Sequence, residues 1–152
     1  MDAKKLSERY AMKPHEENGQ FIERHYEYTG EGRAPSGHIY YYVAAGERTA
    51  FHVIDCDEYF CWHAGDPLEL WLVDEEGTLT VHMLGVENGC EPVLRMPKGI
   101  IFGAVDRGTE GSFVSCITVP RFSYETFRLV GREEITALCP EAAAFFEEEN
   151  DG

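Results

Sequence analysis

Apolar and polar side chains alternate along most of this chain with the two-residue period of β-strands. Turns rich in Gly, Pro and Asp separate these stretches about every ten residues. Short strands at this spacing are typical of a β-sandwich or barrel, so the pattern predicts an all-β fold. The predicted strands cover residues 21–29, 38–45, 50–54, 58–63, 68–74, 78–84, 92–96, 100–105, 112–119 and 126–130.

Only the two ends of the chain have a helical pattern. Residues 3–12 are predicted to form a short helix, and 132–138 and 140–148 two helical turns and a further short helix, with Pro140 tolerated in a first turn. A chain of 152 residues fits one domain. We therefore expect a single domain over 1–152, with the barrel at about 20–130 and a helical segment at about 132–149.

The charge balance narrows the choice of partners. Lys and Arg total 13 against 28 Asp and Glu, a net charge of −15, which repels both phosphate backbones and anionic lipids. We therefore expect no nucleic-acid and no membrane partner. Five cysteines without a C-x-x-C pair, and no apolar run near the ~18 residues of a membrane span, favour a reduced, cytoplasmic protein.

One constellation has fixed spacing: Gly46 and His52 are separated by five residues, His52 and Glu58 by five, and Glu58 and Gly65 by six. This spacing resembles the first motif of the cupin superfamily, in which two histidines and a glutamate meet inside a double-stranded β-helix. The position of the second histidine is occupied by Ile54. The resemblance implies a cupin jelly-roll barrel with a short N-terminal helix and a C-terminal helical segment.

The second cupin motif is also altered at its ligand. Pro97-Lys98-Gly99 resembles its Pro-x-Gly turn, but Phe102 stands where the third metal histidine belongs. A catalytic metal needs about three or four protein ligands, and His52 and Glu58 alone would hold one weakly. We therefore expect no metal and no other cofactor.

Further segments resemble the cupin subfamily named DUF985, or cupin 5. The resemblance extends over residues 15–129 and includes an opening like His-Pro-Glu-Gly-Gly-x-Tyr/Phe, which departs from the family at Glu16 and Asn18. It raises His15 and Glu17 as candidate ligand-binding residues. The segments that carry it are His15 to Phe21, Ile39-Tyr40-Tyr41, Phe51-His52, Asp57-Glu58, Ala64 to Leu70 and Val119-Pro120-Arg121-Phe122.

The resemblance implies a fold similar to that of the dTDP-sugar epimerases, whose metal-free pocket works by proton transfer, and it implies a homodimer. In this interpretation His52 is the base, Glu58 its orienting partner and Tyr42 or Tyr40 the acid. The other candidate ligand-binding residues are Tyr40, Phe60, Trp62 and Phe102. Outward-facing apolar groups at Tyr59, Cys61 and Trp71 would suggest a dimer interface.

Three functions remain open. The first is metal-free isomerase or epimerase chemistry on a small polar metabolite, such as a sugar or nucleotide sugar. The second is a binding or sensory cupin without turnover, and the third is a metal cupin completed by unexpected ligands. A purely structural role is also open, because a buried His52 and Glu58 need partners whether or not they act, and aromatic residues such as Phe60 often belong to the core.

Overall fold

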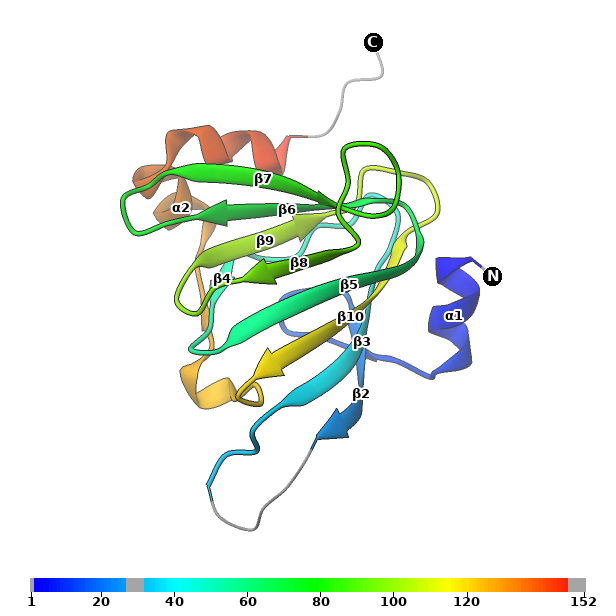
Figure 1. Ribbon diagram of the computed structural model, residues 1–152. Coiled ribbons are helices and arrows are strands. Elements are labelled where there is room, and N and C mark those ends of the chain that lie inside the picture. The colour runs from blue at the N-terminus through cyan, green and yellow to red at the C-terminus, as the bar shows by residue number, and fades with distance from the viewer. Residues whose placement is uncertain (1, 27–31, 148–152) are drawn as a thin grey trace.

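The computed structural model describes residues 2–26 and 32–147 and consists of two antiparallel sheets with helices at both ends of the chain (Figure 1). The six-stranded sheet has the order β1-β2-β3-β10-β5-β8 and the five-stranded sheet the order β11-β4-β9-β6-β7. The strands are β1 (Lys13–Pro14), β2 (Gln20–Tyr26), β3 (Gly37–Val43), β4 (His52–Val53), β5 (Asp57–Gly65), β6 (Leu68–Val73), β7 (Leu79–Leu84), β8 (Val93–Met96), β9 (Ile101–Val105), β10 (Ser112–Val119) and β11 (Arg128–Leu129).

The alternating pattern places one side of each strand in the space between the sheets. On β3, Tyr41 and Val43 point inward and are 2% and 0% exposed, while on β6 the inward residues are Leu68, Leu70 and Leu72. Burial of these apolar surfaces is the main force that holds the two sheets together. The predicted all-β fold with terminal helices is therefore confirmed.

The helices cover part of the outer face of each sheet. α1 (Ala3–Arg9) begins at Asp2, whose carboxylate caps Lys5 N, and packs against β10, β5 and β3. α2 (Arg132–Leu138) and the 3-10 helix η2 (Pro140–Phe146) lie over the five-stranded sheet (Figure 1). A short 3-10 helix, η1 (Tyr124–Thr126), precedes β11. Within the described residues, no helix is long and apolar enough to cross a membrane.

The C-terminal helices bury Trp71. Its ring meets that of Phe145 at 5.5 Å between centroids, and the Phe145 ring packs at a tilt against Phe51 with the centroids 4.4 Å apart. Trp71 is on the outer side of its sheet but only 7% exposed, so it is part of this second core and not of a free surface. The predicted helix at 140–148 is observed over 140–146, as a 3-10 helix.

Candidate functional site

A cavity of about 350 Å³ lies between the two sheets. The six-stranded sheet supplies its wall from β2, β3, β5 and β10, and β4 supplies the opposite wall. The rest of the cavity wall comes from the turn between β1 and β2 and from the segment after β10. Its polar side chains are His15, Glu17, Glu23, His38, His52, Glu58, Thr118 and Arg121. Its apolar and aromatic ones are Phe21, Ile39, Ile54, Cys116, Phe122 and Tyr124.

A tight turn brings Glu17 into this cavity. His15 N donates to Gly19 O at 2.9 Å and Asn18 N to His15 O at 3.0 Å, which closes the turn. Gly19 has φ +76°, and a Cβ there would lie 2.6 Å from the hydroxyl oxygen of Tyr41, so both the backbone and the space require glycine. Ala50 N also donates to Glu17 O at 2.7 Å, which anchors the turn beside β4.

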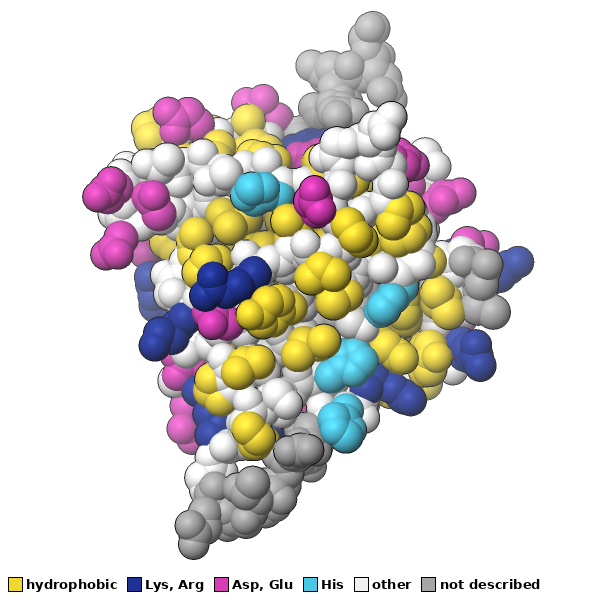
Figure 2. Space-filling view, viewed as in Figure 1, with side chains coloured by type: hydrophobic (Ala, Val, Ile, Leu, Met, Phe, Trp, Pro, Cys, Tyr) yellow, Lys and Arg dark blue, Asp and Glu magenta, His cyan; other side chains and the backbone are white. Residues whose placement is uncertain are grey.

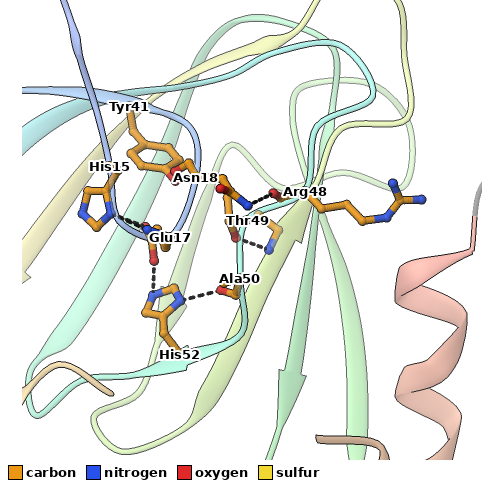
Figure 3. Close-up of polar contacts among 9 residues, drawn as sticks. His15, Glu17, Asn18, Tyr41, Arg48, Thr49, Ala50 and His52 are labelled. Carbon is orange, nitrogen blue, oxygen red and sulfur yellow. Dashed lines mark hydrogen bonds and ion pairs between the residues drawn. The ribbon is translucent and has the colours of Figure 1, made fainter. Parts of the chain in front are cut away.

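His52 and Glu17, which both line the cavity, form an ion pair (Figure 3). His52 Nε2 lies 2.8 Å from Glu17 Oε2, and Nδ1 donates to Ala50 O at 2.9 Å. Because both ring nitrogens face oxygen acceptors, the geometry is that of a doubly protonated imidazolium. Burial opposes this charge, but Glu17 outweighs burial and raises the pKa of His52. Burial likewise opposes ionisation of Glu17, and His52 lowers its pKa.

His15 lies on the other side of Glu17 (Figure 3). Its Nδ1 accepts the backbone N–H of Glu17 at 3.1 Å, so that nitrogen carries no proton. Burial lowers the pKa of His15, in agreement with a neutral ring. His15 is therefore a neutral imidazole with its Nε2–H available as a donor at the cavity wall.

Glu58 differs from His15, Glu17 and His52 in that its side chain is unpaired among the described residues. It lies on β5, is 8% exposed, and faces Thr118 on β10 in the strand register. Within residues 2–26 and 32–147, its carboxyl group has neither a hydrogen-bond nor an ion-pair partner. Burial, and then the negative charge of Glu17, raise the pKa of Glu58 to about 8, although His52 acts in the opposite direction. Glu58 is therefore mostly protonated at neutral pH.

The sequence and the two-sheet fold match known proteins. The family model described as Cupin superfamily (DUF985) matches residues 4–130. The chain belongs to this cupin family. The predicted resemblance is thereby confirmed, over slightly more of the chain than its motifs covered.

Solved structures agree with this assignment. A protein from Shewanella oneidensis is 28% identical, with a TM-score of 0.88 over 97% of this chain and 96% of that one. A hypothetical protein from Leishmania major is 26% identical, with a TM-score of 0.81 over 95% and 96% of the two chains. Oxalate decarboxylase from Bacillus subtilis, at 15% identity and a TM-score of 0.61, shares the fold over 82% of this cupin and 33% of its own length. Among curated proteins, none matches the chain.

The residues at the cupin metal positions do not fit a metal ion. Ile54 lines the cavity beside His52, and Phe102 packs on the His52 ring at 4.2 Å between centroids. Both nitrogens of His52 already face Ala50 and Glu17. In the part of the chain that the structure describes, no three His, Cys, Asp or Glu side chains are grouped so that they could hold a metal.

Four of the candidate residues from the sequence meet at the cavity: His15, Glu17, His52 and Glu58. Their pairing differs from the expectation. The carboxylate that contacts His52 is Glu17, 35 positions away in sequence, while Glu58 remains unpaired. The cupin motif pointed to Glu58, which lies on β5, the next strand along the chain after β4 but in the other sheet. Glu17 reaches His52 through the docking of the β1–β2 turn.

The structure places the aromatic candidates elsewhere. Tyr42 and Tyr40 lie on the outer face of the six-stranded sheet beneath α1, in a cluster with Phe113, so the expected position of both in the cavity is corrected. The two-residue period correctly separates them from Tyr41, and it is Tyr41 that faces inward, where its hydroxyl donates to Asn18 O. Alternation alone cannot say which of the two faces is the inner one.

The other three aromatic candidates belong to the barrel core. Phe60 is 4% exposed and packs near Phe102, which in turn supports the ring of His52. Trp62 is half-buried and donates its Nε1–H to Asp66 O at 3.1 Å. None of the three lines the cavity.

Sequence reasoning missed the residues that form the cavity mouth. Thr118 Oγ1 accepts the backbone N–H of Phe122 at 2.9 Å, and the Arg121 guanidinium binds both carboxylate oxygens of Glu23 at 2.8–3.0 Å. The Val-Pro-Arg-Phe segment carried part of the family resemblance, so it contained a signal, but its role at the mouth depends on tertiary structure.

Proposed function

We propose that this cupin binds a small polar metabolite in the cavity between its sheets, with Glu58 as the group that exchanges a proton with the ligand. The observation that carries the proposal is the unpartnered carboxyl of Glu58 at the cavity wall. The carboxyl group faces the cavity, and a ligand there can form the hydrogen bond that the described residues do not supply.

We assign proton transfer to Glu58 in place of His52, which the sequence analysis had suggested as the base. His52 has no ring nitrogen left to accept a proton, because Ala50 and Glu17 occupy both. Glu58, with a pKa of about 8, can donate in its acid form or accept in its ionised form near neutral pH. Isomerase or epimerase chemistry next to a carbonyl remains the proposed reaction class.

The size of the cavity is compatible with a ligand of about monosaccharide size. Its volume of about 350 Å³ is at the lower end of the usual range for small-molecule sites.

We also propose a cytoplasmic location. The five cysteines are all free, which supports this proposal.

Neutral and amino sugars of monosaccharide size, incubated in D2O and followed by NMR, test this function. We expect at least one to bind and to exchange the hydrogen next to its carbonyl. Glu58→Gln should slow this exchange at least 100-fold, the usual size of a general acid–base contribution. Glu91→Gln, which removes an equal charge at an exposed position, should leave the exchange unchanged.

The outcomes separate the open functions. Binding without exchange identifies a binding or sensory cupin. Exchange that survives Glu58→Gln contradicts the assigned role of Glu58, and failure of the whole panel to bind contradicts the proposed site.

We also propose that the outer face of the six-stranded sheet pairs with a second copy of the chain. Hydrophobic side chains gather over β5, β8 and β10, with histidines beside them (Figure 2). Val93 on β8 and Val119 on β10 are 52% and 46% exposed. Tyr59 and Cys61, which are half-buried on β5, belong to the same face.

Light scattering after gel filtration checks this dimer. We expect twice the mass of one chain for the native protein, and a shift toward one chain for Val93→Lys because a buried lysine without a partner destabilises an interface. Val86→Lys is the control, since Val86 is 64% exposed on the loop between β7 and β8. A native protein with the mass of one chain would contradict the proposal.

A further inference from the structure

We propose that the group which the ligand places against Glu58 is a protonated amine, so that the cavity selects small organic amines over neutral and anionic molecules of the same shape. This inference rests on the proposed function, because it assumes that the cavity is a ligand site. It goes further by naming the chemical class of the ligand.

The charges around the cavity leave one position for a cation. Glu17 is paired with His52, and Glu23 with Arg121, so each of these pairs is close to neutral. His15 is a neutral ring, because its Nδ1 accepts the Glu17 N–H. His38 lies with Nε2 2.8 Å from Ser115 Oγ, and burial lowers its pKa, which also favours a neutral ring. Glu58 is then the acidic group for which the described residues supply no counter-charge. A ligand ammonium would supply both the positive charge and the N–H donors that a carboxylate accepts.

An anionic ligand group is disfavoured at the same place. It would lie beside two carboxyl groups, Glu17 and Glu58, in a buried site where repulsion is poorly screened. The His52 cation gives little compensation, since Glu17 already neutralises it. The net charge of −15 on the whole chain also attracts cations and repels anions at long range.

Aromatic rings form the cavity wall toward the mouth. Phe21 and His15 meet at 4.9 Å between centroids, and Phe122 and Tyr124 at 4.8 Å. The faces of phenyl and phenol rings attract organic cations within about 6 Å, and sites for alkylated ammonium ions combine such rings with carboxylates. Phe21, Phe122 and Tyr124 therefore suit the carbon skeleton of an amine whose charge lies at Glu58.

The inference predicts that amine binding is coupled to loss of the Glu58 proton, which can be measured. Glu58 must lose its proton to pair with an ammonium, and its pKa in the free protein is about 8. The groups around it are Glu17 from the β1–β2 turn, His52 from β4, Cys56 before β5 and Cys116 from β10. Burial raises the pKa of both thiols, to about 12 for Cys56, so they stay neutral. Amine affinity should rise about tenfold per pH unit from pH 6 to 8 and then level off.

Calorimetric titration with three probes of matched shape tests the inference: benzylamine, benzyl alcohol and benzoate. We expect benzylamine to bind at least tenfold more tightly than the other two at pH 8. At pH 7 its binding should release close to one proton, measured from the dependence of the heat on the buffer. Glu58→Gln should weaken benzylamine at least tenfold and change benzyl alcohol less than threefold, while Glu91→Gln should change neither.

Each contrary result has a defined meaning. If benzyl alcohol binds as tightly as benzylamine, or if amine affinity does not change with pH, the amine inference is overturned while the ligand site stands. If benzoate binds best, the charge argument is overturned in the same way. If none of the three probes binds, and no sugar of the panel binds either, both the inference and the proposed function fail together.

Discussion

The contribution of Glu58 to the free energy of unfolding is expected to fall as the pH rises from 5 to 8, and Glu58→Gln is expected to remove this contribution. The pKa of Glu58 is about 8 in the folded protein, against an ordinary value of 4.5. The folded state therefore holds this proton over a range where the unfolded state has lost it. Stability then decreases by ~1.4 kcal/mol per pH unit, roughly 5 kcal/mol in all, and levels off above pH 8.

Glu17 and His52 do not reverse this sign. His15, whose pKa burial lowers, adds stability as the pH rises toward 6.5, but this contribution cancels in the comparison because the native protein and Glu58→Gln both contain His15. The pKa of Glu17 is lowered, so its contribution is lost only as the pH falls below its ordinary value, outside the window. The pKa of His52 is raised above 6.5, so its stabilisation is lost as the pH rises through the upper part of the window, in the same direction as that of Glu58.

Urea denaturation of both proteins at pH 5, 6, 7 and 8, followed by circular dichroism, measures the effect. The difference between Glu58→Gln and the native protein should move by several kcal/mol in favour of the variant across this range. Parallel curves for the two proteins would show that the folded state does not hold the Glu58 proton.

Gly65→Ala is expected to destabilise the protein by roughly 3–5 kcal/mol, through backbone strain together with overpacking. Gly65 ends β5 with φ +91°, where a side chain is strained. A Cβ at this position would lie 2.0 Å from Gly111 O and 2.7 Å from the Ala3 side chain. Neither neighbour can move freely, because Gly111 O accepts the Asp66 N–H and Ala3 is fully buried in α1.

Gly46→Ala is the matched control. Gly46 also has a positive φ, +77°, but a Cβ there would meet nothing within 4 Å. Only the backbone penalty remains, so we expect a loss of about 1–2 kcal/mol. Urea denaturation of the two variants measures both losses in the free energy of unfolding. Equal losses would show that a Cβ at position 65 causes no destabilising contact with Gly111 and Ala3.

Both glycines belong to the motif that first indicated a cupin, and they show which part of the fold could be predicted from sequence. Positive φ at Gly46 and Gly65 is a local requirement, and the spacing between them spans β4 and β5, which are consecutive in the chain. Such features are properties of short segments, so the strands, the turns and the family could all be predicted. The ends of the strands were less accurate: the segment predicted at 50–54 pairs as a strand only at His52–Val53.

The pairing within the site could not be predicted in the same way. His52 and Glu58 have motif spacing, yet the carboxylate at His52 belongs to Glu17. That contact depends on the turn from His15 to Gly19 docking beside β4, through the bond from Ala50 N to Glu17 O. No periodicity connects segments that lie more than thirty residues apart in sequence.

By itself, the sequence determined the all-β barrel, its terminal helices, the cupin family and four of the residues that line the cavity, because alternation, turn glycines and motif spacing are local patterns. Tertiary structure alone decided that Tyr41 faces inward while Tyr40 and Tyr42 pack beneath α1, since alternation is the same for either face. It also decided that Glu17 neutralises His52 and leaves Glu58 buried without a partner. Charge pairing and the pKa of a buried carboxyl depend on distances and burial in three dimensions. The spacing of residues along the chain does not specify either.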